Sequence, residues 1–434
     1  MKFLFKIALL LLSVQTTLYA NTPLNIESFT TATGVPVMFY QTMDVPMLDI
    51  NIAFHAGSAF DGQQFGLSAL TTHLLNQGSS HYTANQIADQ LASVGAQYKA
   101  ESNRDMILIG LKTLSKPDAL TPAIQTLAST LQYPDFPEDA FLAQKKQQFI
   151  RIQHVQESAE DLGDQTFFQA LYQAHPYAHP IDGNATTLDT ITKADVQHFY
   201  QRFFTKKNVH IVLVGAINKT KALEIANTLT QHLPTGQKAS STPLARPLST
   251  EMDIEVPFDS SQTVIRVGHL GMNHQNQHYF ALIVGNHILG GGSLVSQLAH
   301  ELREKRGLTY GAYSEFTPMP GIGPFIIRLS TRHTQAKLAE TLTRDTLATF
   351  IKNGPSKQEL MDAKAYLTGG FPVALASNES LAAILIKINF YDLPKDYLNH
   401  YIEHINAVTE DEIKQAFQAQ IDPAKLLQVS VGKP

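Results

Sequence analysis

Three residues near the C-terminus have the types and spacing of a zinc-peptidase motif. His400-Tyr-Ile-Glu-His404 places two histidines four residues apart, so both side chains lie on one helix face. Two such imidazoles bind zinc, and the glutamate between them can activate a metal-bound water as a general base. The apolar residues around the trio mark the opposite face as the buried one; they are Leu398, Ile402 and Ile405. If the trio binds a metal at all, an adventitious surface site is favoured over a catalytic one, because nothing in the pattern argues for Glu410 or Glu412 as a substitute third ligand.

A second stretch, Gly290 to Tyr310, joins three glycines to a predicted amphipathic helix and a turn at Gly307. Leucines at every fourth position from Leu294 to Leu302 predict one apolar helix face. Arg303 projects beside that face, and Tyr310 follows the turn, so the phenol can return towards the guanidinium. By pattern alone, this is a capped helix with a surface arginine and a half-buried strand tyrosine. His175 and His179 are also four apart, but the prolines around them predict a solvent-exposed loop.

Composition limits the chemistry further. The chain has no cysteine, which excludes disulfides, thiolate catalysis and Cys-zinc sites. The first 20 residues are typical of a secretory signal: Lys2 and Lys6 precede an apolar run, and Tyr19-Ala20 precedes the expected cleavage point. Of the 33 basic residues, two lie in this segment, so 31 remain against 38 acidic ones, a net charge of −7. We therefore expect an exported, periplasmic protein without a stable membrane span and without a nucleic-acid partner.

The order of predicted elements repeats once along the chain. Strands are predicted at 35–40, 48–54, 106–111 and 209–215, and again at 264–270, near Tyr310, near Ile326 and at 427–431. Gly95-Ala-Gln-Tyr98 matches Gly307-Leu-Thr-Tyr310, and the helix entered at Pro137 resembles the one entered after Pro355. The separations are close to half of the chain, which indicates domain duplication.

This repeat predicts an α+β fold of two homologous domains, each a mostly antiparallel sheet packed with helices. The expected divisions are a signal peptide at 1–20, an N-terminal domain at 21–235, a linker at 236–257 and a C-terminal domain at 258–434. The linker is inferred from prolines, serines and threonines with little periodicity.

Four segments together resemble the pitrilysin/insulinase family of zinc peptidases, in particular its half-size, two-domain members such as the mitochondrial processing peptidase subunits. They are the helix from Gly66 to Gly78, His175-Pro-Tyr177 with Gly183, Asn208 to Gly215, and Leu302 to Tyr310. The last segment is the most specific. The resemblance covers essentially the whole mature chain.

The family's zinc helix carries H-x-x-E-H, and aligning it on Gly66 and Gly78 places that motif at Ala69-Leu-Thr-Thr-His73. The first ligand is replaced by Ala69, the general base by Thr72, and only His73 remains. Downstream, the family's helical glutamates align with Lys146 and Gln153. We therefore expect a degenerate site with no zinc in this chain, and a packed or hydrogen-bonded His73.

The resemblance also implies roles for Arg303 and Tyr310, which match an arginine and a tyrosine that hold the substrate backbone and stabilise the oxyanion in active members. A permanently charged guanidinium and a phenol suit this role as hydrogen-bond donors. Gly291, Gly292 and Ser293 are expected to contact the peptide substrate, because glycine permits close approach of a second chain.

Taken together, the resemblance implies the non-zinc subunit of an exported heterodimeric metallopeptidase, with zinc and general base on a homologous partner chain. Two alternatives remain: a binding or assembly protein that keeps the fold without catalysis, and an autonomous peptidase that uses His400 to His404. The sequence identifies neither the peptide substrate nor the partner.

Overall fold

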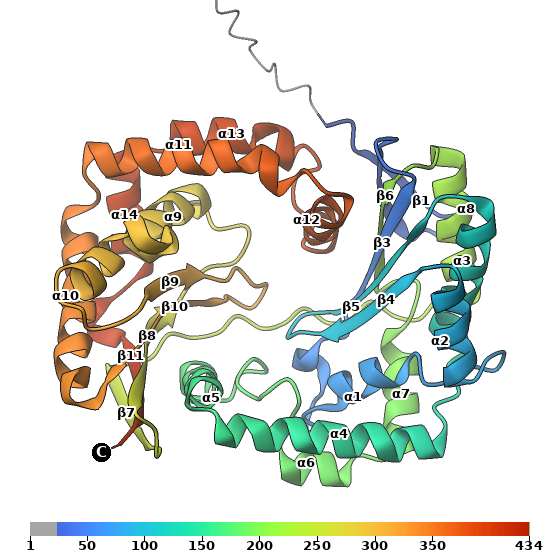
Figure 1. Cartoon of the computed structure of the whole chain (residues 1–434), viewed down its shortest axis with the longest axis horizontal. Helices are drawn as coiled ribbons and strands as arrows, with labels where there is room; N and C mark the ends of the chain where they lie inside the picture. The colour runs from blue at the N-terminus through green and yellow to red at the C-terminus, as the bar shows by residue number, and fades with distance from the viewer. Residues whose placement is uncertain (1–23, 434) are drawn as a thin grey trace, which may run out of the picture.

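The computed structural model describes residues 24–433, so the predicted signal at 1–20 lies outside the described residues. Two lobes, each built on one β-sheet, face each other in Figure 1, with the first half of the chain on the right. Helices cover the outer side of each sheet.

The first sheet has six strands in the order β1-β2-β6-β3-β5-β4. All neighbouring strands are antiparallel except β2 and β6, which are parallel. The strands are β1 (Glu27–Thr30), β2 (Pro36–Gln41), β3 (Met47–Phe54), β4 (Gln97–Ser102), β5 (Ile107–Leu114) and β6 (Val209–Gly215).

The second sheet has five strands in the order β7-β11-β8-β10-β9, and only β7 and β11 are parallel. Without β1, the first sheet has the same order and the same single parallel pair, which establishes the predicted duplication. The strands are β7 (Met252–Pro257), β8 (Gln262–Leu270), β9 (Ala312–Phe316), β10 (Pro324–Arg332) and β11 (Leu427–Gly432).

The expected linker at 236–257 is therefore too long. Residues 236–251 contain no helix or strand, but the last six residues form β7 at the edge of the second sheet. Pro257 ends this edge strand, where its missing N–H breaks no ladder in the sheet interior.

The helices follow the same plan in both halves. Those of the first half are α1 (Leu67–Leu74), α2 (Ala84–Ser93), α3 (Pro117–Gln132), α4 (Glu138–Glu157), α5 (Ala159–Tyr172), α6 (Ala185–Thr190), α7 (Lys193–Phe203) and α8 (Lys219–Thr230), with the short η1 (Ser58–Phe60). Those of the second half are α9 (Tyr279–Asn286), α10 (Ala336–Asn353), α11 (Lys357–Ala374), α12 (Asn378–Phe390), α13 (Tyr397–Ala407) and α14 (Glu410–Gln420), with the short η2 (His287–Gly291), η3 (Ser293–Val295), η4 (Ala299–Glu304), η5 (His333–Gln335) and η6 (Pro423–Lys425).

The two halves exchange one helix each. Helix α5 comes from the first half but packs on β8 and β11 of the second sheet, while α12 comes from the second half and packs on β3 and β6 of the first sheet (Figure 1). Apolar contacts bury both helices: Phe167 and Leu171 of α5 join the second sheet, and Leu381 and Leu385 of α12 join the first. The exchange ties the halves together.

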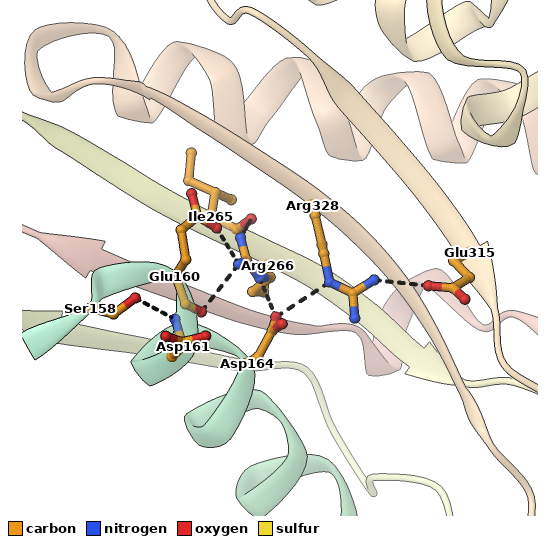
Figure 2. A network of polar contacts seen from close by, with 8 residues as sticks. All are labelled: Ser158, Glu160, Asp161, Asp164, Ile265, Arg266, Glu315 and Arg328. Atoms are coloured by element: carbon orange, nitrogen blue, oxygen red, sulfur yellow. Dashed lines mark hydrogen bonds and ion pairs between the residues drawn. The ribbon is translucent and has the colours of Figure 1, made fainter. Parts of the chain in front are cut away.

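Polar contacts reinforce this exchange. Arg266 on β8 is 2% exposed and is held by Glu160 and Asp164 of α5 (Figure 2). Across the other seam, buried Asp105 accepts hydrogen bonds from the phenols of Tyr177, at 2.5 Å, and Tyr391, at 3.1 Å. Each contact gives a buried polar group a partner, and without that partner its burial would destabilise the fold.

Within residues 24–433, no single helix combines the length and the apolar composition of a membrane span. Helices α11 and α12 meet these criteria only as a pair, which is bent by 108°.

Candidate functional site

Helix α1 carries the degenerate zinc motif, and its remaining polar groups are used within the fold. Ala69 and Thr72 are buried, and the Thr72 hydroxyl donates a 2.8 Å hydrogen bond to the carbonyl of Ser68, one turn earlier. Thr72 therefore lacks the basicity of a catalytic base, and its hydroxyl proton is already engaged within the helix.

His73 is half-buried, and burial lowers its pKa below the usual value. The positive charge of Arg151 lowers this pKa further, while the carboxylate of Asp182 acts in the opposite direction. A guanidinium close to the one surviving histidine disfavours a metal cation there.

The residue of α4 that contacts the start of α1 is Gln148. Its side chain is fully buried, and its Nε2 donates 2.9 Å hydrogen bonds to the carbonyls of Gly66 and Asp182. Lys146 and Gln153, which the sequence alignment placed at the family's glutamates, are both exposed. That register is wrong because α4 has few buried apolar residues, so its spacing does not define which face meets α1.

Arg151 lies one turn beyond Gln148, and its Nε is 3.2 Å from Asp182 Oδ1. The side chains beside α1 are thus an amide, a guanidinium and a carboxylate that is already paired. Neither an amide N–H nor a guanidinium coordinates a metal. The sequence offered only one indirect signal for this group, because Asp182 precedes Gly183 of the family pattern.

The loop from His175 to Gly183 packs against α1 rather than extending into solvent. Gly183 has φ +75°, and a Cβ there would lie 2.0 Å from the carbonyl oxygen of Phe65, so only glycine fits. His179 is buried and stacks on Phe65 with ring centroids 4.2 Å apart, and His175 Nε2 donates to the carbonyl of Pro243 at 2.8 Å. The predicted solvent-exposed loop is therefore wrong, because proline excludes a helix but does not prevent burial.

In the second half, the predicted helix from Leu294 is interrupted. η3 ends at Val295, and the extended backbone of the next residue, Ser296, separates it from the turns that continue into η4. Leu294 is consequently exposed, while Leu298 and Leu302 are fully buried. The four-residue spacing predicted one continuous face but did not reveal this break.

The glycines before η3 have packing roles of their own. A Cβ on Gly292 would lie 2.7 Å from the carbonyl oxygen of His287, where the backbone N–H of Gly292 already donates. Gly291 and Ser293 are exposed, so they remain available to a peptide.

Arg303 and Tyr310 are brought together by the turn at Gly307. The backbone N–H groups of Gly307 and Leu308 donate to the carbonyls of Arg303 and Leu302 at 2.9 Å, which folds the chain back beside η4. The guanidinium carbon of Arg303 lies 5.4 Å from the centre of the Tyr310 ring, and Tyr310 is 88% exposed. The pair forms a cation–π contact that presents its polar groups to solvent.

Arg303 is unusual among the charged residues of its helix. Lys305 and Arg306 both pair with Glu301, and His300 pairs with Glu304. Among residues 24–433, no carboxylate lies within 4.0 Å of the Arg303 guanidinium. Its hydrogen-bond donors are therefore free to bind a carbonyl or an anion.

The literal H-x-x-E-H at the C-terminal end is a surface feature of α13. His400 is paired with Asp396 and Glu403, and these carboxylates raise its pKa above the usual value. His404 instead stacks on Phe280, with ring centroids 4.5 Å apart. Within residues 24–433, no group of three His, Asp or Glu side chains is placed to hold a metal ion, at α13 or at α1.

The fold and the site together define a duplicated, peptidase-like α+β protein in which the helix of the metal motif lacks its ligands. Residues 40–184 match the family described as insulinase (peptidase family M16), and residues 190–367 match the peptidase M16 inactive domain. The crystal structure of a peptidase M16 inactive domain from Pseudomonas fluorescens is 34% identical, covers 95% of this chain and 98% of its own, and superposes with a TM-score of 0.92. The chain therefore belongs to the M16 (pitrilysin/insulinase) peptidase family.

Two curated relatives show how names vary within this group. A protein of Rickettsia felis called an uncharacterized zinc protease is 25% identical, over 79% of this chain and 82% of its own length. A protein of Helicobacter pylori called the non-peptidase homolog YmxG is 24% identical, over 89% of both chains. At this level of identity, one relative is named a protease and the other a non-peptidase. The role of this chain must therefore be inferred from its own residues.

Proposed function

We propose that this protein is the non-zinc subunit of an exported, periplasmic heterodimeric metallopeptidase. In this proposal, Arg303 and Tyr310 hold the peptide backbone and stabilise the oxyanion, with Gly291, Gly292 and Ser293 beside the peptide. A homologous partner chain supplies the zinc and the general base.

The observation that carries the proposal is the half-buried Arg303, which pairs with no carboxylate among residues 24–433, beside the 88% exposed Tyr310. An arginine and a tyrosine held only for folding would be expected to pair with a carboxylate or to bury the ring. Here, the Tyr310 ring is exposed and no carboxylate among residues 24–433 pairs with the Arg303 guanidinium, as required for groups that meet a carbonyl oxygen. Meanwhile α1 retains only His73, so hydrolysis requires a metal from elsewhere.

A second candidate is a binding or assembly protein that keeps the peptidase fold without catalysis. The relative named as a non-peptidase homolog supports this reading. Under it, the Arg303–Tyr310 pair contacts a protein partner and takes part in no hydrolysis.

The test is to purify the mature chain, mix it with a zinc-motif homologue from the same organism, and measure cleavage of a peptide library. We expect the mixture to be active and each chain alone to be inactive. Arg303→Ala and Tyr310→Phe should each lower kcat/KM by about 100-fold, as loss of one oxyanion donor does.

Two matched controls lie next to these residues. Arg306→Ala removes an arginine that is already paired with Glu301. Tyr313→Phe removes the hydroxyl of another partly exposed tyrosine. Both should leave kcat/KM unchanged. An inactive complex that nevertheless assembles would favour the binding protein, and full activity of the Arg303 and Tyr310 variants would disprove their assigned role.

A further inference from the structure

A cavity of about 690 Å³ lies at the seam between the two halves, away from α1 and from Arg303. From the first half, it is lined by β1, by the start of β2 and by His55 and His210. From the second half, it is lined by the end of α12 and the chain that follows to Lys395, together with His274. Its size lies within the range of small-molecule sites.

The wall of this cavity contains several aromatic rings. The His55 ring stacks on Phe390 with centroids 4.0 Å apart, and the His274 ring lies 4.2 Å from that of Tyr391. Phe29 also lines the space. Aromatic rings in this arrangement favour a planar, apolar ligand body.

The polar groups of the wall are imidazoles whose orientation is partly determined. The Asn389 amide donates to the carbonyl of Ile211 at 3.1 Å, so its Oδ1 accepts from His210 Nδ1–H at 3.3 Å. This leaves Nε2 as the free acceptor of a neutral His210. The ring centroids of His55 and His210 are 5.3 Å apart in an edge-to-face arrangement, so the two imidazoles are neighbours in the wall.

His274 is the residue of the wall whose polar groups most need a partner. Both of its ring nitrogens are buried, and neither has a hydrogen-bond partner among residues 24–433. A neutral imidazole has one donor and one acceptor, and burying both without partners is destabilising. Buried polar groups of this kind normally meet an ordered water or a ligand.

The charges at the cavity select the type of ligand. Burial lowers the pKa of His55 to about 3 and that of His274 to about 4, so both rings are neutral near pH 7. Positive charge comes from Lys238 and Lys395, against the single carboxylate of Asp392. Within residues 24–433, these histidines do not form a group of three metal ligands. The excess of positive charge in the lining therefore favours an organic anion over a metal ion.

We propose that the seam cavity binds a small aromatic carboxylate. Its ring would lie against Phe390 and Tyr391, its carboxylate would face Lys238 and Lys395, and His274 would gain a polar partner. Because the cavity is lined by both halves, such a ligand stabilises the packing of α12 on the first sheet. This site is independent of the proposed peptidase role.

The experiment uses the full mature chain with 3-phenylpropionate as the probe and 3-phenylpropanamide as its uncharged counterpart. Calorimetric titration should show saturable 1:1 binding of the acid and a rise in Tm with its concentration. The amide should bind about tenfold more weakly, because it lacks the charge that the lysines recognise.

Two variants and one control locate the site. His274→Phe keeps an aromatic ring at this position but removes both nitrogens, and Lys238→Gln removes the charge of an exposed side chain. Each should weaken binding of the acid by about three- to tenfold, whereas Lys352→Gln on the exposed side of α10 should not. The proposal is overturned if the acid does not bind up to its solubility limit, if acid and amide bind equally, or if both variants bind like the unmodified chain.

Discussion

Arg266 Nε lies 2.5 Å from Asp164 Oδ1, and this contact joins β8 of the second half to α5 of the first (Figure 2). Arg266 Nη2 is also 2.5 Å from Glu160 Oε2, and Arg328 Nε approaches the same Asp164 oxygen at 3.3 Å. A nearly inaccessible guanidinium is thus neutralised by two carboxylates from an exchanged helix. The halves depend on each other for charge compensation as well as for apolar burial.

We therefore predict that Asp164→Ala destabilises the protein by about 2–4 kcal/mol, because it leaves a buried charge incompletely paired. Asp161→Ala on the same helix is the control, since its exposed carboxylate pairs with no arginine within residues 24–433. Urea unfolding of both variants measures the difference. Equal stability of the two would show that the Arg266–Asp164 contact contributes nothing.

The tyrosines at the two matched Gly-x-x-Tyr segments should respond differently to truncation. Tyr98 packs against the first core, so Tyr98→Ala should reduce the free energy of unfolding by about 2–4 kcal/mol. Tyr310 is 88% exposed, so Tyr310→Ala should change it by less than about 0.5 kcal/mol. A large loss in the Tyr310 variant would mean that this residue serves folding and not a ligand.

The free energy of unfolding should decrease as the pH is lowered below the ordinary pKa of histidine. Burial holds the pKa of His55 near 3 and that of His274 near 4, whereas both are close to 6.5 in the unfolded chain. The unfolded state therefore binds more protons between these values, and stability is fully present above about pH 6.5 and lost progressively below it. The free energy of unfolding should be lower at about pH 5 than at about pH 7.5, by roughly 2 kcal/mol per buried histidine.

His55→Gln should remove part of this pH dependence. His232→Gln, at an exposed histidine, should retain all of it. Parallel pH profiles for the unmodified chain and the His55 variant would contradict the assignment.

Restoring the zinc motif on α1 alone should not restore zinc binding. Ala69→His with Thr72→Glu rebuilds H-x-x-E-H, but Arg151 still places a positive charge near His73 and Gln148 still supplies no carboxylate. We expect zinc to bind in stoichiometric amount only when Gln148→Glu and Arg151→Leu are added. Elemental analysis after dialysis against zinc measures this, and one full equivalent in the double variant would refute the role given to Arg151.

Much of this protein was predictable from sequence because it depends on local pattern. Apolar spacing located most strands and helices, and the repeated segments predicted two homologous domains. The loss of the first zinc ligand and of the general base depends only on residue type, because Ala69 has no ligand atom in its side chain and the Thr72 hydroxyl is not basic near neutral pH. Since Arg303 and Tyr310 are only seven positions apart with a glycine turn between them, their proximity was also predictable.

Only the tertiary structure decided which surfaces these elements meet. The periodicity of α5 and α12 shows that each has an apolar face, but it does not say that each covers the sheet of the other half. Likewise, the few apolar residues of α4 could not place Gln148 and Arg151 beside α1. The matching Gly-x-x-Tyr segments could not show that Tyr98 packs inward while Tyr310 is exposed. Local periodicity determines which face of an element is buried, whereas the identity of its neighbour follows from long-range packing and charge compensation across the whole chain.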